Sequence, residues 1–91
     1  MSTEVVNIIR HHHEQYDGNG YPDKLTGKSI PLEARIAAVA DVYDALTSDR
    51  PYRKKYSAEK AAVIMISLKG SSLDPELVEI LLERVATQVR T

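Results

Sequence analysis

The chain has 91 residues, 43% of them hydrophobic and 27% charged, which allows one small globular domain and excludes a second. Its formal net charge of −1 gives no overall attraction to nucleic acid or to an anionic membrane, so we expect no DNA binding. It has no cysteine, which excludes disulfides and thiolate zinc sites and fits a cytoplasmic location. No apolar run approaches the roughly 18 residues that span a bilayer, so we expect no membrane insertion.

The first predicted helix begins at Ser2 or Thr3, either of which can cap it, and carries a run of three histidines near its end. Its apolar positions recur at helical spacing as far as His12 and His13, before a DGNG stretch ends the helix. Residues 18–30 hold three glycines and one proline without periodicity. They predict a long ordered loop of the kind that often carries function.

Three more helices are predicted after this loop. Pro31 fits the first turn of the second helix, Ser57 caps the third helix, which runs to Gly70, and Asp74 with Pro75 opens the fourth. The apolar stripe of the second helix is Ile36, Val39, Ala40 and Tyr43. The inward positions of the fourth are Leu77, Ile80, Leu81, Val85 and Val89. No segment predicts a strand, so the predicted fold class is all-α.

Histidines and a carboxylate in this pattern are candidate metal ligands. Successive helical residues point about 100° apart, so His12 and His13 can serve different ions of one cluster, although a plain surface run of histidines is the alternative. Asp41 lies among alanines and valines on a helix that we expect to be buried. A buried carboxylate needs a cation or strong donors. A metal ion would meet that need, as would pairing with Arg35 or Arg53, or a position on the solvent side.

A basic turn is the second candidate site. Arg50 and Arg53 flank a stiffening proline, Pro51, and present two guanidinium groups from a short segment that suits phosphate. The alternative is an ordinary solvated basic turn. Asp44, one helical turn after Asp41, is either solvated or supports a neighbouring group.

These features form part of one long match. The string HHEQYDGNGYPDKLTGKSIPLEARIAAVADVYDALTSDRPYR, from His12 to Arg53, closely resembles the signature region of the HD-GYP family of metal-dependent phosphohydrolases. That family consists of phosphodiesterases of cyclic di-GMP that act in bacterial signal transduction. The resemblance implies that residues 1–91 are the C-terminal half of an HD-GYP domain. The GYP loop, named after Gly20, Tyr21 and Pro22, would lie between the first two helices.

The resemblance also implies roles for particular residues. His12, His13 and Asp41 would ligate a centre of two or three divalent ions, and histidine with carboxylate suits iron or manganese. His11 lies outside the motif and receives no role, and Asp44 would at most support a ligand. No side chain of this chain is assigned as catalytic. The residues implied to bind or border the substrate are Gly20, Tyr21, Pro22, Arg50 and Arg53.

The chain departs from the family in lacking the HD pair and the other ligands that lie upstream of the His-His motif. We therefore expect an upstream HD half as a partner, with a sensor or receiver domain beyond it. Three protein ligands cannot saturate two or three ions, so we expect the chain alone to bind metal weakly and to be inactive. Its uncovered apolar faces predict self-association into a homo-oligomer. Two functions remain open: part of a cyclic di-GMP phosphodiesterase yielding pGpG or GMP, or a catalytically inactive regulatory or interaction module.

Overall fold

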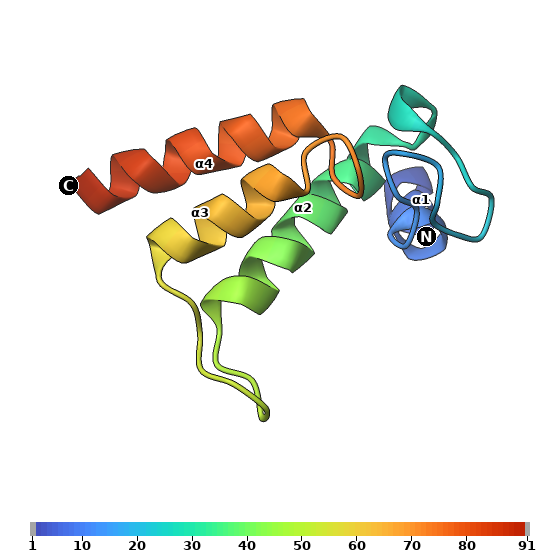
Figure 1. Cartoon of the computed structure of the whole chain (residues 1–91). Coiled ribbons are helices and arrows are strands. Elements are labelled where there is room, and N and C mark those ends of the chain that lie inside the picture. The colour runs from blue at the N-terminus through green and yellow to red at the C-terminus, as the bar shows by residue number, and fades with distance from the viewer. Residues whose placement is uncertain (1, 91) are drawn as a thin grey trace.

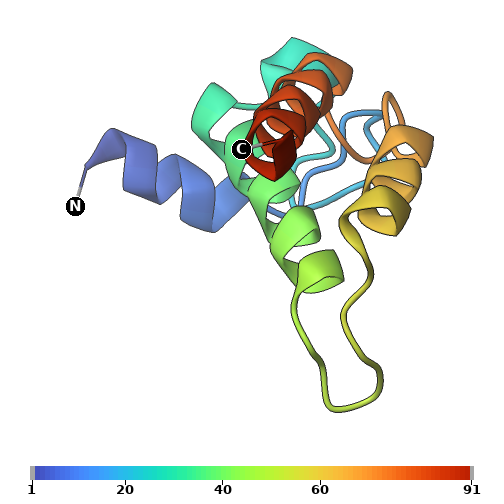
Figure 2. The same cartoon turned by 90° about the vertical axis from the view of Figure 1, so that its left-hand side faces the viewer.

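The computed structural model describes residues 2–90, with side chains described up to residue 87. Its elements are α1 (Thr3–His11), the 3-10 turn η1 (Gly27–Ser29), α2 (Leu32–Thr47), α3 (Ala58–Ser67) and α4 (Pro75–Arg90). Helices α2, α3 and α4 lie side by side, whereas α1 lies beside the first part of α2 and extends away from the other helices (Figures 1 and 2). No strand forms within residues 2–90, so the predicted all-α class with four helices is confirmed.

The polar residues that cap helices explain where three of the four helices begin. The Ser2 hydroxyl accepts from the Val5 amide at 3.2 Å, and the Ser57 hydroxyl accepts from the Lys60 amide at 3.1 Å. The Asp74 carboxylate accepts from the Glu76 amide at 2.9 Å. Each cap satisfies an amide that has no partner within its own helix. The predicted starts of α1, α3 and α4 are therefore confirmed.

The core lies between α2, α3 and α4. Its buried members are Val39 from α2, Met65 from α3, Leu73 from the turn before α4, and Val78 from α4. Partly buried side chains pack around them: Ala38, Val42, Tyr43, Leu46, Leu68, Leu77, Leu81 and Leu82. Burial of these apolar side chains is the main favourable contribution to the stability of this three-helix unit.

A buried ion pair fixes the start of α4 against α2. Nη1 of Arg35 lies 2.8 Å from Oδ2 of Asp74, and the two side chains are only 13% and 2% exposed. Nε of Arg35 also donates to the Ile30 carbonyl at 2.9 Å. The pair therefore connects the loop before α2, α2 itself and the N-terminus of α4. Of the alternatives for Arg35, the structure shows pairing with Asp74 rather than with Asp41.

Four sequence expectations about the helices were wrong. Helix α3 ends at Ser67, with Leu68 as its C-cap, and does not run to Gly70. Helix α1 ends at His11, so His12 and His13 follow the helix instead of lying within it. Pro31 is the N-cap of α2 and not part of its first turn. Ile36 and Ile80 are about half exposed, at 49% and 54%, because the buried faces of α2 and α4 are rotated away from them. The side chain of Val89 lies outside the described residues.

An apolar groove of about 260 Å³ runs between α2 and α4. It is lined by Ile36, Val39, Ala40, Leu77, Ile80 and Leu81. Helix α1 also exposes apolar side chains, at Val5, Val6 and Ile9. Within the described residues, none of the helices is both long and apolar enough to cross a membrane.

Candidate metal centre

His12 is held by the last turn of α1. Its amide donates to the Ile8 carbonyl at 3.0 Å, and its ring Nδ1 lies 2.8 Å from the same oxygen and 3.1 Å from the Ile9 carbonyl. A carbonyl oxygen only accepts, so Nδ1 carries a hydrogen, and in the neutral ring the lone pair is on Nε2. Metal-binding histidines are commonly oriented by such a bond from the other ring nitrogen. This contact leaves Nε2 as the His12 nitrogen that could bind a metal ion.

His13 lies close to two other rings. Its ring centroid is 4.0 Å from that of His12 and 4.9 Å from that of Tyr21, and the Tyr21 ring is stacked on it with an interplanar angle of 22°. The Tyr21 amide also donates to the His13 carbonyl at 3.2 Å. The loop after α1 thus fixes both the backbone and the ring of His13.

The three predicted ligands meet in one pocket of about 310 Å³. The end of α1 and the following loop contribute His12 and His13, and α2 contributes Asp41. The remaining lining residues are Glu14, Gln15, Ala38, Val42, Ser72 and Leu73. Segments distant in the sequence therefore bring two imidazoles and a carboxylate to the same opening.

Asp41 is exposed, which corrects the expectation of a buried helix face at this position. Helix α2 buries Ala34 and Val39 against the other helices, and Asp41 lies on the side that opens to the pocket. No hydrogen bond or ion pair of its carboxylate occurs among the described side chains. The exposure agrees with the alternative of a position on the solvent side, and the place of Asp41 on the pocket wall leaves its carboxylate accessible to an ion.

The two arginines of the basic turn have different partners. Arg53 donates from Nη2 to the Ala45 carbonyl at 2.8 Å and from Nη1 to the Lys54 carbonyl at 3.0 Å. Its guanidinium also lies 4.3 Å from the centroid of the Tyr56 ring. Arg53 thus satisfies a carbonyl in the last turn of α2, as basic residues often do at a helix C-terminus. These bonds engage its guanidinium within the chain.

The Arg50 side chain has fewer partners than that of Arg53. Its Nη2 lies 3.6 Å from Oδ2 of Asp44, whose side chain is 76% exposed, and its buried Nε has no hydrogen-bond partner among the described residues. Asp44 also accepts from the Ser48 hydroxyl at 3.2 Å and does not line the pocket. Arg50 therefore keeps donor capacity, and Asp44 interacts with the turn and not with the predicted ligands.

The GYP loop packs tightly on the backbone that follows α1. Gly20 is buried, and a Cβ there would collide with backbone atoms of His13, Glu14 and Gln15. Tyr21 and Pro22 are exposed, joined by a cis peptide bond. Only glycine permits this close approach, and it brings the exposed Tyr21 ring onto His13.

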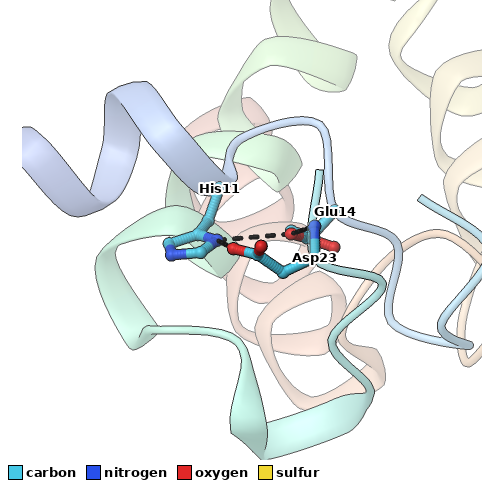
Figure 3. Close-up of side chains that lie close together, drawn as sticks. All are labelled: His11, Glu14 and Asp23. Atoms are coloured by element: carbon cyan, nitrogen blue, oxygen red, sulfur yellow. Dashed lines mark hydrogen bonds and ion pairs between the residues drawn. The ribbon is translucent and has the colours of Figure 1, made fainter. Parts of the chain in front are cut away.

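A second cluster was not foreseen from the sequence. His11, Glu14 and Asp23 bring their side chains together between the end of α1 and the GYP loop (Figure 3), with one potential ligand atom from each within 4.8 Å of the others. The spacing of His11 and Glu14, three residues apart, was the available signal. Asp23 could not be added, because it joins the pair only when the loop has folded back.

Glu14 is the buried member of this cluster. Burial raises the pKa of its carboxyl, but hydrogen bonds from the Asp23 amide, the His11 ring and the Leu25 amide outweigh that effect, so the pKa is lowered below 4.5. Its carboxylate is therefore a stable acceptor at neutral pH.

A family model described as an HD domain matches residues 1–77. The chain belongs to the HD domain family. Residues 1–77 include the whole pocket, from His12 to Leu73.

Two relatives of this HD-domain chain are both named as phosphodiesterases. It is 52% identical over 75 residues to the cyclic di-GMP phosphodiesterase response regulator RpfG of Xanthomonas campestris, covering 82% of this chain and 20% of that protein. It is 46% identical over 76 residues to the 3'3'-cGAMP-specific phosphodiesterase 2 of Vibrio cholerae, covering 84% and 15%. The chain thus spans a fifth or less of the length of these relatives. The assignment to the HD-GYP family is confirmed.

The fold agrees with that of a solved relative. The structure of a cyclic GMP-AMP-specific phosphodiesterase of V. cholerae, V-cGAP3, matches with a TM-score of 0.83 at 31% identity, over 99% of this chain and 20% of that one. HD domains are metal-dependent, and the donors of this pocket, two imidazoles and one carboxylate, suit a divalent metal ion. The orientation of His12 by a backbone carbonyl fits the same role.

Proposed function

We propose that this chain is part of a metal-dependent phosphodiesterase domain that hydrolyses cyclic di-GMP to pGpG or GMP. The observation that carries the proposal is the shared pocket of His12, His13 and Asp41, with His12 oriented by α1. The names of the relatives, phosphodiesterases of cyclic di-GMP and of 3'3'-cGAMP, support a cyclic dinucleotide as the substrate class.

In this proposal the three residues ligate a centre of two or three ions, iron or manganese. When bound, such ions stabilise charge on phosphoryl oxygens and activate a water molecule. Arg50 and Arg53 bind substrate phosphates, Arg50 with a guanidinium that forms only a 3.6 Å ion pair with Asp44 among the described residues, and Arg53 while it also holds the turn through the Ala45 carbonyl. Gly20, Tyr21 and Pro22 border the substrate next to His13. The remaining metal ligands come from an upstream HD half, which a sensor or receiver domain would control.

The chain by itself is expected to be inactive. Its three ligands leave most positions around each ion to water, so both occupancy and activation of water fall. The test grafts residues 1–77 into the Xanthomonas relative in place of its matching segment. The hybrid and the isolated chain are each incubated with cyclic di-GMP and Mn²⁺ or Fe²⁺, and pGpG is followed by chromatography.

We expect metal-dependent hydrolysis by the hybrid, loss of that activity in Asp41→Asn, and retention in Glu59→Gln, which alters an exposed residue of α3. Sustained hydrolysis by the isolated chain would overturn its proposed inactivity. A folded hybrid that binds the dinucleotide, but binds no metal and shows no turnover, would instead favour the regulatory module over the phosphodiesterase.

A further inference from the structure

His11 precedes the matched signature, yet its side chain is only 11% exposed. Its Nδ1 lies 3.3 Å from Oε2 of Glu14 and 3.6 Å from Oδ2 of Asp23 (Figure 3). Both neighbours are carboxylate oxygens, which accept, so Nδ1 carries the ring hydrogen and donates. The last residue of α1 thus points a donor at the two carboxylates.

Glu14 transmits this contact to the loop. Its two carboxylate oxygens accept from the Asp23 amide at 2.9 Å and from the Leu25 amide at 3.0 Å. Glu14 also directly follows His13, whose carbonyl accepts from the Tyr21 amide. One buried carboxylate therefore connects the end of α1, the backbone beside His13 and the far side of the GYP loop.

Asp23 is held from the other side. Arg10 donates from Nε and Nη2 to its two oxygens at 2.9 and 2.8 Å. All four carboxylate oxygens of Glu14 and Asp23 therefore accept a hydrogen bond from the protein. A metal ion would have to displace these donors, so the cluster is complete as a hydrogen-bonded contact and differs in this from the pocket of His12 and Asp41.

We propose that His11 is a positioning residue: through Glu14 and Asp23 it fastens loop 20–25 to the end of α1, and this sets the Tyr21 ring on His13. Its importance for catalysis rests on the proposed function, in which His13 is a metal ligand. The positioning itself is a property of this chain.

The test uses three variants of the isotope-labelled chain. His11→Asn keeps a donor near the position of Nδ1, His11→Gln moves it to the position of Nε2, and His11→Leu removes it. Nuclear magnetic resonance measures amide hydrogen exchange at Asp23 and Leu25 and the ring signals of His13. Losing the donor to a buried carboxylate should speed exchange at both amides by about ten- to a hundredfold.

We expect His11→Leu and His11→Gln to speed exchange and to move the His13 signals toward those of a Tyr21→Leu chain, while His11→Asn restores both. Unchanged exchange and unchanged His13 signals in His11→Leu would overturn the proposal. It would also be overturned if His11→Asn restored the slow exchange and the His13 signals no better than His11→Gln. If the Leu variant does not fold, the comparison of Asn with Gln decides.

A Mn²⁺ titration of the same samples separates this inference from the proposed function. A parent chain that binds no Mn²⁺ counts against the metal centre, while amide exchange and the His13 signals still decide the role of His11. If the parent binds Mn²⁺, His11→Leu should bind it several-fold more weakly. Altered exchange with unchanged His13 signals and unchanged Mn²⁺ affinity would show a contact that does not position His13, and would overturn the positioning role.

Discussion

Replacing Arg53 by alanine should destabilise the fold much more than replacing Arg50. Arg53 loses a charged hydrogen bond to the half-buried Ala45 carbonyl, worth about 1.5 to 2 kcal/mol, and a more exposed bond to Lys54, worth about 0.5 kcal/mol. Loss of its stacking on Tyr56 adds about 0.5 to 1 kcal/mol. The expected loss in the free energy of unfolding is about 3 kcal/mol.

Arg50→Ala is the matched control, because it removes the same side chain three residues earlier. Among the described residues the Arg50 side chain forms only an ion pair with the exposed Asp44 at 3.6 Å, for which we expect less than about 1 kcal/mol. Urea unfolding at neutral pH, followed by circular dichroism, compares both variants with the parent chain. Equal losses, or a larger loss for Arg50→Ala, would refute the assignment of Arg53 to holding the turn.

Three further predictions concern the loop, the buried carboxylate and the apolar faces. Gly20→Ala should lower the free energy of unfolding by about 3 kcal/mol, because the added Cβ collides with the backbone at residues 13–15. Gly70→Ala is the control: its Cβ meets open space, but the φ of +81° should still lower the free energy of unfolding by about 1 kcal/mol. Thermal melting compares the two variants. Because Glu14 has a lowered pKa, its contribution to stability is full above its ordinary value of 4.5 and is lost as pH falls below it. The difference in free energy of unfolding between the parent and Glu14→Gln should therefore shrink as the pH is lowered. The neighbours His11, Asp23 and Arg10 are present in both chains, so their titration is common to both. A difference that stays constant with pH would contradict this. The isolated chain should self-associate through the apolar groove, so sedimentation should show oligomers that Ile36→Glu with Ile80→Glu dissolves, and a strictly monomeric parent would oppose the idea.

Local signals in the sequence were sufficient for the starts of α1, α3 and α4 but not for the ends of α1 and α3. Ser57 before an apolar run and the Asp74 and Pro75 pair act through backbone groups within a few residues. Such signals do not depend on tertiary packing. The start of α2 was displaced by one residue, because Pro31 fits an N-cap as well as a first turn.

What could not be predicted depends on packing between distant segments. The periodicity of α2 shows that one face is apolar but not which neighbours cover it, so the exposure of Ile36 and Asp41 was missed. The Arg53 side chain reaches back eight residues to Ala45, and the sequence shows only that it is basic. His11 joins Asp23 through the fold of the intervening loop, which no local pattern reports. The residue pattern made His12, His13 and Asp41 candidate ligands, but only the family resemblance joined them in one centre.

The most direct test of the metal centre is the Mn²⁺ affinity of this chain, measured by electron paramagnetic resonance of the free ion. Asp41→Asn removes the carboxylate from the pocket wall, and Asp44→Asn makes the same change one helical turn away, outside the pocket. We predict that Asp41→Asn raises the dissociation constant at least about tenfold and that Asp44→Asn changes it by less than about twofold. Equal effects of the two substitutions, or no effect of Asp41→Asn on measurable binding, would contradict a metal centre built on His12, His13 and Asp41.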